Sequence, residues 1–138
     1  MMKPIKIIEC PRDAMQGIKT FIPTEKKVQY IQSLLRVGFD TIDFGSFVSP
    51  KAIPQLVDTA EVLAQLDLST TTSKLLAIIA NTRGAVEACK HPEIDYLGYP
   101  FSISENFQMR NTHKTIAQSV VTLSEILELA NKHNKEVV

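Results

Sequence analysis

The chain has 138 residues, enough for one domain with its own core, and its 15 Lys and Arg are balanced by 15 Asp and Glu, so no net field favours nucleic acid or an anionic membrane as a partner. Its two cysteines lie far apart in the sequence and indicate no disulfide framework, which favours a reducing compartment. Because no stretch approaches the roughly 20 apolar residues of a membrane span and none resembles a signal peptide, we expect a cytoplasmic protein.

The first predicted strand leads directly into a pair of opposite charges. Residues 5–8 form a short, mostly apolar run that is typical of a buried strand, and the run breaks at Pro11. Arg12 and Asp13 follow at once. In a barrel of alternating strands and helices the carboxyl ends of the strands share one mouth, so this pair would face a polar substrate or a metal. The alternative is an ordinary solvated turn with adjacent charges.

Helix and strand signals then alternate along the rest of the chain. Helices are indicated where apolar residues recur at steps of three and four, and strands where short apolar runs lie between polar or glycine-containing segments. Pro54 is placed to start one helix and Thr112 to cap the last. In chain order the predicted elements are a helix at 24–37, a strand at 39–44, a helix at 54–66, a strand at 75–80, a helix at 81–89, a strand at 94–99, a polar loop at 100–111, a helix at 112–130 and the start of a fifth strand at 135–138.

This alternation predicts an α/β fold with one parallel sheet, and two architectures accept it. One is an open doubly wound sheet; the other is part of an eight-stranded barrel of about 250 residues. No glycine-rich phosphate loop follows the first strand, which disfavours a nucleotide-binding fold. The sequence also stops at Val138, where a doubly wound domain would cover its last strand. We therefore predict a partial (β/α)8 TIM barrel over residues 1–138, made of the first four βα units and the start of a fifth strand.

In a barrel, one mouth would collect polar side chains from successive strand ends. Asp13 is a candidate ligand for Mg²⁺ or Mn²⁺, because hard cations prefer oxygen ligands, and Asp43 is a candidate base or a carboxylate that supports the metal site. Arg12 could polarise a carbonyl or hold a carboxylate through its forked donors. The other residues expected at this mouth are Ser46, Asn81 and residues 102–105.

Several of the reactive residue types also have a structural interpretation. Asp43 at a strand end is as often a cap for the next turn as a catalyst. His91, His113 and His133 have no mutual spacing suited to a metal and are interpreted as structural or surface residues. Cys10 is interpreted as a small buried residue, because no histidine lies near it in the sequence to act as a base.

Three segments resemble the motifs of one enzyme family. They are PRDAMQ at 11–16, SFVSPKAIPQ at 46–55 and SENFQMRN at 104–111. In order and separation they are similar to the PRDGLQ, SFVSPKxxPQ and SExFxxxN motifs of hydroxymethylglutaryl-CoA lyases, and the resemblance covers the whole chain. The SFVSPK segment is the most specific part, since PRD is shared by the wider group of acyl-CoA lyases, isopropylmalate-type synthases and related aldolases.

The resemblance implies a metal-dependent retro-Claisen cleavage of an acyl-CoA substrate, hydroxymethylglutaryl-CoA, to acetyl-CoA and acetoacetate. By this resemblance Asp13 would bind the divalent cation, and Arg12 would stabilise the enolate-like oxygen of the departing acetyl group. Gln16 and Ser46 match positions that line the substrate pocket. Asp43 stands where the family usually has a glutamate. Because aspartate is one methylene shorter, its carboxylate reaches less far, by on the order of 1.5 Å.

The family's remaining ligands are not in this sequence. An H-x-H pair, an asparagine and a mobile-loop cysteine come from the later half of a full barrel, and the chain contains no H-x-H. We therefore expect little or no lyase activity from the 138 residues alone. One hypothesis is the N-terminal half of such a lyase, cut by design, gene truncation or proteolysis. The other is a non-catalytic half-barrel that forms a homo-oligomer or pairs with another half, because open edges of an apolar sheet invite strand addition.

Overall fold

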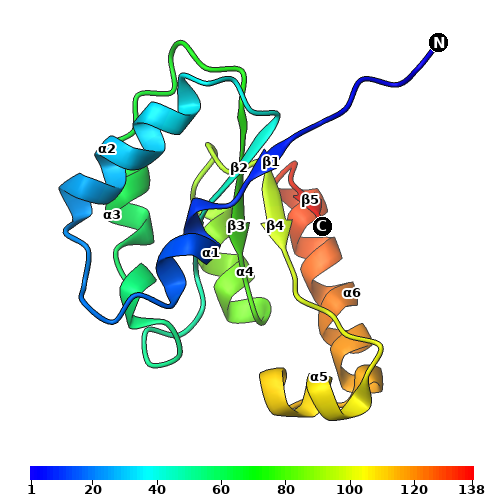
Figure 1. Cartoon of the computed structure of the whole chain (residues 1–138). Helices are drawn as coiled ribbons and strands as arrows, with labels where there is room; N and C mark the ends of the chain where they lie inside the picture. Colours follow the sequence, from blue (N-terminus) through cyan, green and yellow to red (C-terminus); the bar gives the residue numbers. More distant parts are fainter.

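The computed structural model describes all 138 residues, and its central element is a five-stranded sheet (Figure 1). Helices connect the strands, and the first five residues run away from the sheet at the end opposite to α5. The elements are β1 (Ile8–Glu9), α1 (Pro11–Gln16), α2 (Thr24–Leu35), β2 (Thr41–Ser46), the 3₁₀ helix η1 (Pro54–Leu56), α3 (Thr59–Ala64), β3 (Lys74–Ile78), α4 (Thr82–Cys89), β4 (Tyr96–Gly98), α5 (Glu105–Thr112), α6 (Ile116–Lys132) and β5 (Glu136–Val137).

The strands are parallel, and each one pairs with the next in the sequence, giving the order β1-β2-β3-β4-β5. Thr41 of β2 lies between Ile8 of β1 and Lys74 of β3, and Tyr96 of β4 is paired with both Leu76 and Glu136. A doubly wound sheet reverses its strand order at a switch point, whereas a barrel adds each strand beside the last. The observed order is that of a barrel wall.

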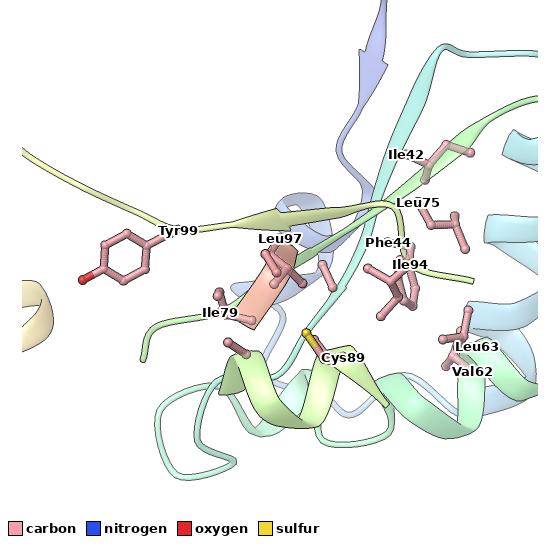
Figure 2. Close-up of a cluster of buried hydrophobic side chains, with 14 of the residues drawn as sticks. Ile42, Phe44, Val62, Leu63, Leu75, Ile79, Cys89, Ile94, Leu97 and Tyr99 are labelled. Carbon is pink, nitrogen blue, oxygen red and sulfur yellow. The ribbon is translucent and has the colours of Figure 1, made fainter. Parts of the chain in front are cut away.

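The core lies on one face of this sheet. Alternate strand residues, such as Ile42 and Phe44 of β2 or Leu75 and Ala77 of β3, point to the same side and are buried there (Figure 2). Helices α2, α3, α4 and α6 supply the opposing side chains, including Ile31, Val62, Ala88 and Ile126. The helices that pack on this core all cover the same face of the sheet, which distinguishes a barrel segment from a doubly wound sheet, so the prediction of a partial TIM barrel is confirmed.

The first strand is shorter and more exposed than predicted. Ile5, Ile7 and Ile8 are 91%, 60% and 50% exposed, and only Ile8–Glu9 forms β1. The reason is that β1 lies at the edge of the sheet and pairs with β2 alone. The expectation of a buried strand was therefore wrong, although its position in the chain was right.

Two helix predictions also differ from the structure. The predicted helix at 54–66 is divided into η1 and α3, because the backbone leaves the helical path at Asp58, where the Thr59 hydroxyl donates to Leu56 O at 2.8 Å. The predicted loop at 100–111 contains α5, capped by Ser104. Thr112 ends α5 rather than capping α6. The cap of α6 is Thr115, in a capping box with Gln118. None of the helices has the length and apolar character needed to cross a bilayer.

Candidate active site

Four of the predicted site residues meet where β2 passes α1. The chain turns from β1 into α1 at Pro11, which occupies the first helical turn, where a missing N–H costs nothing. Arg12 and Gln16 lie four positions apart on α1 and so share one side of it, with Asp13 beside Arg12. Asp43 is in the middle of β2, whose six residues are all buried.

Arg12 and Asp43 form a forked ion pair. Arg12 Nη2 donates to Asp43 Oδ2 at 2.6 Å, and Arg12 Nε is 3.2 Å from Oδ1 and 3.1 Å from Oδ2. The Asp43 side chain is only 6% exposed and that of Arg12 15%. Paired donors on a planar guanidinium match a carboxylate in direction as well as charge, so this contact fixes the orientation of Arg12.

The remaining terminal nitrogen of Arg12 faces its own helix. Nη1 donates to Asp13 Oδ1 at 3.2 Å and to Gln16 Oε1 at 2.9 Å. Three side chains from two elements therefore hold the guanidinium. A guanidinium has five N–H donors, and these contacts leave one N–H of Nη2 without a protein acceptor.

The charges in this cluster shift one another's protonation. Burial raises the pKa of Asp43, and the hydrogen bonds and charge of Arg12 oppose that rise without cancelling it. Burial alone would lower the pKa of Arg12, but its hydrogen bond to Asp43 and the charge of Asp43 outweigh burial and raise it. Arg12 therefore stays a cation, and Asp43 is a carboxylate that takes up a proton more readily than a solvated one.

Ser46 lies at the end of β2 but outside this cluster. Its backbone N–H donates to Thr59 Oγ1 at 3.1 Å, and its own hydroxyl oxygen accepts from Val48 N at 3.2 Å. It lines a separate hollow of about 330 Å³ between the loop after β2 and the start of α4. The structure thus brings Arg12, Asp13, Gln16 and Asp43 together but gives Ser46 no hydrogen bond to them.

The other residues predicted at the mouth have structural partners. Asn81 caps α4 by accepting from Gly84 N at 2.9 Å, and Ser104 caps α5 by accepting from Phe107 N at 3.3 Å. Glu105 accepts from Ile116 N at 3.1 Å, which ties α5 to α6. These contacts agree with the preference of Ser and Asn for helix N-caps and identify no chemical role.

The residues of this chain do not fit a complete metal centre. Asp13 is 73% exposed and offers a free carboxylate oxygen, but both oxygens of Asp43 accept from Arg12. No group of three or more His, Cys, Asp or Glu side chains is arranged to hold an ion. A Mg²⁺-type ion needs six oxygen ligands and keeps many waters when the protein offers one carboxylate, so Asp13 alone would bind it weakly.

The chain resembles known proteins over nearly its whole length. It is 32% identical over 136 residues to the mitochondrial hydroxymethylglutaryl-CoA lyase of Arabidopsis thaliana, covering 98% of this chain and 29% of that protein. It is 32% identical to a Pseudomonas aeruginosa 3-hydroxy-3-isohexenylglutaryl-CoA/hydroxymethylglutaryl-CoA lyase, covering 98% of this chain and 45% of the relative. The matched part is the N-terminal half of these relatives. No family model matches the chain.

Solved structures agree with the sequence matches. The Bacillus subtilis HMG-CoA lyase superposes with a TM-score of 0.88 at 32% identity, covering 99% of this chain and 46% of that one. The Acinetobacter baumannii HMG-CoA lyase, determined in complex with coenzyme A and 3-methylmalate, gives a TM-score of 0.87 at 34% identity, with 96% and 44% coverage. The chain matches the N-terminal half of hydroxymethylglutaryl-CoA lyases. It spans less than half the length of the relatives named here.

The three lyase-like motifs occupy distinct places in the fold. PRDAMQ is helix α1, SFVSPKAIPQ runs from the end of β2 into η1, and SENFQMRN lies largely in α5. Two buried polar residues were not predicted to contribute to the site: Gln55, the last residue of the SFVSPKAIPQ motif, and Lys27 in α2. They are 4% and 1% exposed, and glutamine and lysine are residue types that give no sequence signal of burial.

Proposed function

We propose that this chain supplies the Arg12 half of the active site of a divalent-metal-dependent hydroxymethylglutaryl-CoA lyase, which cleaves its acyl-CoA substrate to acetyl-CoA and acetoacetate. The observation that carries the proposal is the forked Arg12–Asp43 pair beside Asp13 and Gln16, in a chain similar to lyases of this name. A relative determined with coenzyme A supports an acyl-CoA ligand. Asp13 is the metal ligand that this chain would contribute, with the others coming from outside these residues.

In this reaction the proton leaves the C3 hydroxyl of the substrate, the C2–C3 bond breaks, and C3 becomes the ketone of acetoacetate. The electron pair of the broken bond moves to the thioester fragment as an enolate, which takes up a proton at carbon to give acetyl-CoA. Arg12 would stabilise the enolate oxygen with the N–H of Nη2 that has no protein acceptor. Preorganised donors of this kind contribute roughly 10²–10³ in rate.

Asp43 would act mainly through Arg12. The sequence left two roles open, a base and a supporting carboxylate. Because both carboxylate oxygens accept from Arg12, the geometry favours support: Asp43 holds the guanidinium in the direction that the enolate oxygen requires. Gln16 fixes the opposite side of the guanidinium at 2.9 Å and, being exposed, can also contact substrate.

A second candidate function, pairing of half-barrels, is favoured by the sheet edges. β1 and β5 each pair with a strand on one side only, and Ile8 and Val138 near these edges are 50% and 65% exposed. Open strand edges invite pairing with another chain. Size-exclusion chromatography with light scattering tests this function: a dimer or higher oligomer is expected, and a monomer at all concentrations would contradict it.

A cleavage assay with Mg²⁺ or Mn²⁺ tests the lyase function. The chain alone is expected to show little turnover, and addition of the C-terminal half of the Bacillus subtilis relative is expected to restore it. Arg12→Gln should then lower kcat by about 10²-fold, whereas Arg36→Gln, at an exposed arginine without an ion-pair partner, should not. Enzyme-like turnover by the chain alone would show that its ligand set is complete, and failure of both rescue and coenzyme A binding would contradict the lyase function.

We also propose a reducing, cytoplasmic location. Both cysteines are unpaired, Cys10 at the surface and Cys89 in the interior. Free thiols are the normal state in reducing compartments, and oxidising ones favour disulfides. A fluorescent fusion expressed in the source cells tests this location, and recovery of the fusion from an oxidising compartment would contradict it.

A further inference from the structure

The loop between α1 and α2 is held by one buried side chain. Residues 17–23 form no helix or strand, so their backbone groups need partners elsewhere. Gln55 Nε2 donates to Ile18 O at 2.8 Å and to Thr20 O at 2.9 Å, and its Oε1 accepts from Ile22 N at 2.8 Å. A side-chain amide has two donors and an acceptor oxygen, and Gln55 uses all three on this loop.

Gln55 is itself anchored to α2 by a buried charge pair. Lys27 Nζ donates to the backbone oxygen of Gln55 and lies 2.6 Å from Asp58 Oδ1, while Thr24 Oγ1 donates to Asp58 Oδ2 at 2.7 Å. The same ammonium lies 4.1 Å from the ring centroid of Phe21, within the loop that Gln55 holds. With Lys27 1% exposed and Asp58 6%, the start of η1 has little freedom to move.

The segment that carries Gln55 also contacts β2. Thr59 accepts from Ser46 N at 3.1 Å, and its methyl group packs on Gly45, where any side chain would collide with it. Residues 55–59 therefore contact both elements of the candidate site. They hold the loop that continues α1 on one side and the end of β2 on the other.

We propose that Gln55 is a positioning residue for Arg12. The loop that it holds begins at Gly17, directly after Gln16, and Gln16 bonds to Arg12. Fixing this loop against η1 sets where α1 stands relative to β2, and so sets the Arg12 to Asp43 contact. The predicted effect of Gln55 on catalysis rests on the proposed lyase function. The predicted effect of Gln55 on the contact between Arg12 and Asp43 does not depend on that function.

Hydrogen exchange at the Arg12 Nε–H, measured by ¹⁵N NMR on the 138-residue chain, tests the proposal. An Nε–H held by Asp43 is protected, and one that loses its fixed partner exchanges faster. In Gln55→Leu we expect at least about tenfold faster exchange at Arg12, with β3 amide exchange unchanged. Gln55→Glu keeps the acceptor for Ile22 N but turns a carboxylate oxygen toward Ile18 O and Thr20 O, so it should accelerate exchange at least as much as Gln55→Leu. Gln65→Leu is the matched control, because Gln65 is exposed and its side chain hydrogen-bonds only to Glu61 O of the adjacent helix α3.

Two results would overturn the proposal. One is unchanged Arg12 exchange in a folded Gln55→Leu variant. The other is equal acceleration at Arg12 and at the β3 amides, which would mean that Gln55 only supports global stability. If Gln55→Leu does not fold, Gln55→Glu decides by the same comparison.

A kinetic experiment separates the proposal from the lyase function. In the chain complemented with a C-terminal half, Gln55→Leu should lower kcat and kcat/KM by the same factor, as expected when a group acting in the transition state is misplaced. A rise in KM with kcat unchanged would contradict positioning. If the complemented protein has no lyase activity, the lyase function fails, and the exchange experiment still decides the role of Gln55.

Discussion

Arg12 and Asp43, 31 positions apart in the sequence, are joined by an ion pair with 2.6 Å between Nη2 and Oδ2. The pair connects the helix after β1 to the neighbouring strand β2 and is largely removed from solvent. A buried carboxylate without its partner is costly, so the pair constrains stability as well as any chemistry at the site.

Replacing Arg12 should therefore destabilise the chain more than a surface substitution does. Arg12→Gln leaves Asp43 without its cation, and removing one partner of a buried pair costs about 3–5 kcal/mol, at the low end here because Arg12 is 15% exposed. The double variant Arg12→Gln with Asp43→Asn should recover part of the loss, since no charge is then buried. Urea unfolding measures both. Equal stabilities of the wild type and Arg12→Gln would show that the pair contributes nothing.

A pH dependence follows from the raised pKa of Asp43. Its ordinary value is 3.8, and burial raises it in the folded chain. Because the folded pKa is the higher one, the stability from this group is fully present below 3.8 and is lost as pH rises through the folded pKa. The amide side chain of an Asp43→Asn variant does not titrate, so the unfolding free energy of that variant should rise relative to that of the wild type as the pH is raised above 3.8. A ¹³C carboxyl titration of Asp43 with a midpoint at or below 3.8 would contradict this prediction.

How much of the fold the sequence predicts depends on whether each element buries an apolar stripe. α2 and α4 were predicted closely, the first ending before Gly38, whose φ of 86° suits glycine, and the second capped by Asn81. α5 was missed because its one buried residue is Gln108, which leaves no apolar period to detect. The alternation of strands and helices along the sequence was enough to predict that the strands are parallel and lie in one sheet.

The candidate site, too, could be predicted from the sequence only in part. Arg12, Asp13 and Asp43 were expected at one mouth because they follow or end adjacent parallel strands. That rule gives no distances, so it could not show that Arg12 binds both oxygens of Asp43. It also placed Ser46 at this mouth; Ser46 does end β2, but its hydrogen bonds are to Thr59 and Val48 and not to Arg12.

Cys10 should react slowly with thiol reagents although it is exposed, which corrects its interpretation as a buried residue. Partial desolvation of the thiol and the charge of Asp43 raise the pKa of Cys10 from its ordinary value of 9.0, so little thiolate exists near neutral pH. Alkylation by iodoacetamide, followed by mass spectrometry, should accelerate as pH rises through and beyond 9.0. Asp43→Asn removes one of the raising charges and should speed the reaction at a given pH. Unchanged rates in that variant would contradict the coupling.

Lys135 is expected to matter for stability far more than its sequence position suggests. It is 5% exposed, and its ammonium donates to His91 O at 2.7 Å and Ile94 O at 2.6 Å, joining the turn before β5 to the turn before β4. Lys135→Met would leave Ile94 O without a donor and His91 O with only its 3.3 Å hydrogen bond from Ile94 N, at a cost of about 2–3 kcal/mol, since hydrogen bonds to charged groups contribute roughly 1.5–3 kcal/mol. Lys132→Met, at an exposed position, is the control. Equal urea midpoints for the two variants would contradict the prediction.

Gly45 of β2 and Thr59 of α3 lie in close contact at the end of the strand, where no side chain fits on Gly45. A Cβ on Gly45 would lie 2.5 Å from Thr59 Cγ2 and 3.0 Å from its Oγ1, closer than carbon atoms tolerate. Gly45→Ala should therefore destabilise by about 1–3 kcal/mol, the usual cost of overpacking a buried contact.

Adding Thr59→Ser to Gly45→Ala should restore part of that stability, because serine keeps the hydroxyl that accepts from Ser46 N and lacks the colliding methyl group. Gly17→Ala is the matched control, since nothing lies within 4 Å of its Cβ position. Urea unfolding of the four proteins measures the effect. Because Gly45 belongs to β2, the strand that carries Asp43, and Thr59 packs on it, the Arg12 Nε–H exchange should change with Gly45→Ala and recover in the double variant. Loss of stability without recovery in the double variant would show that the clash is not with the Thr59 methyl group.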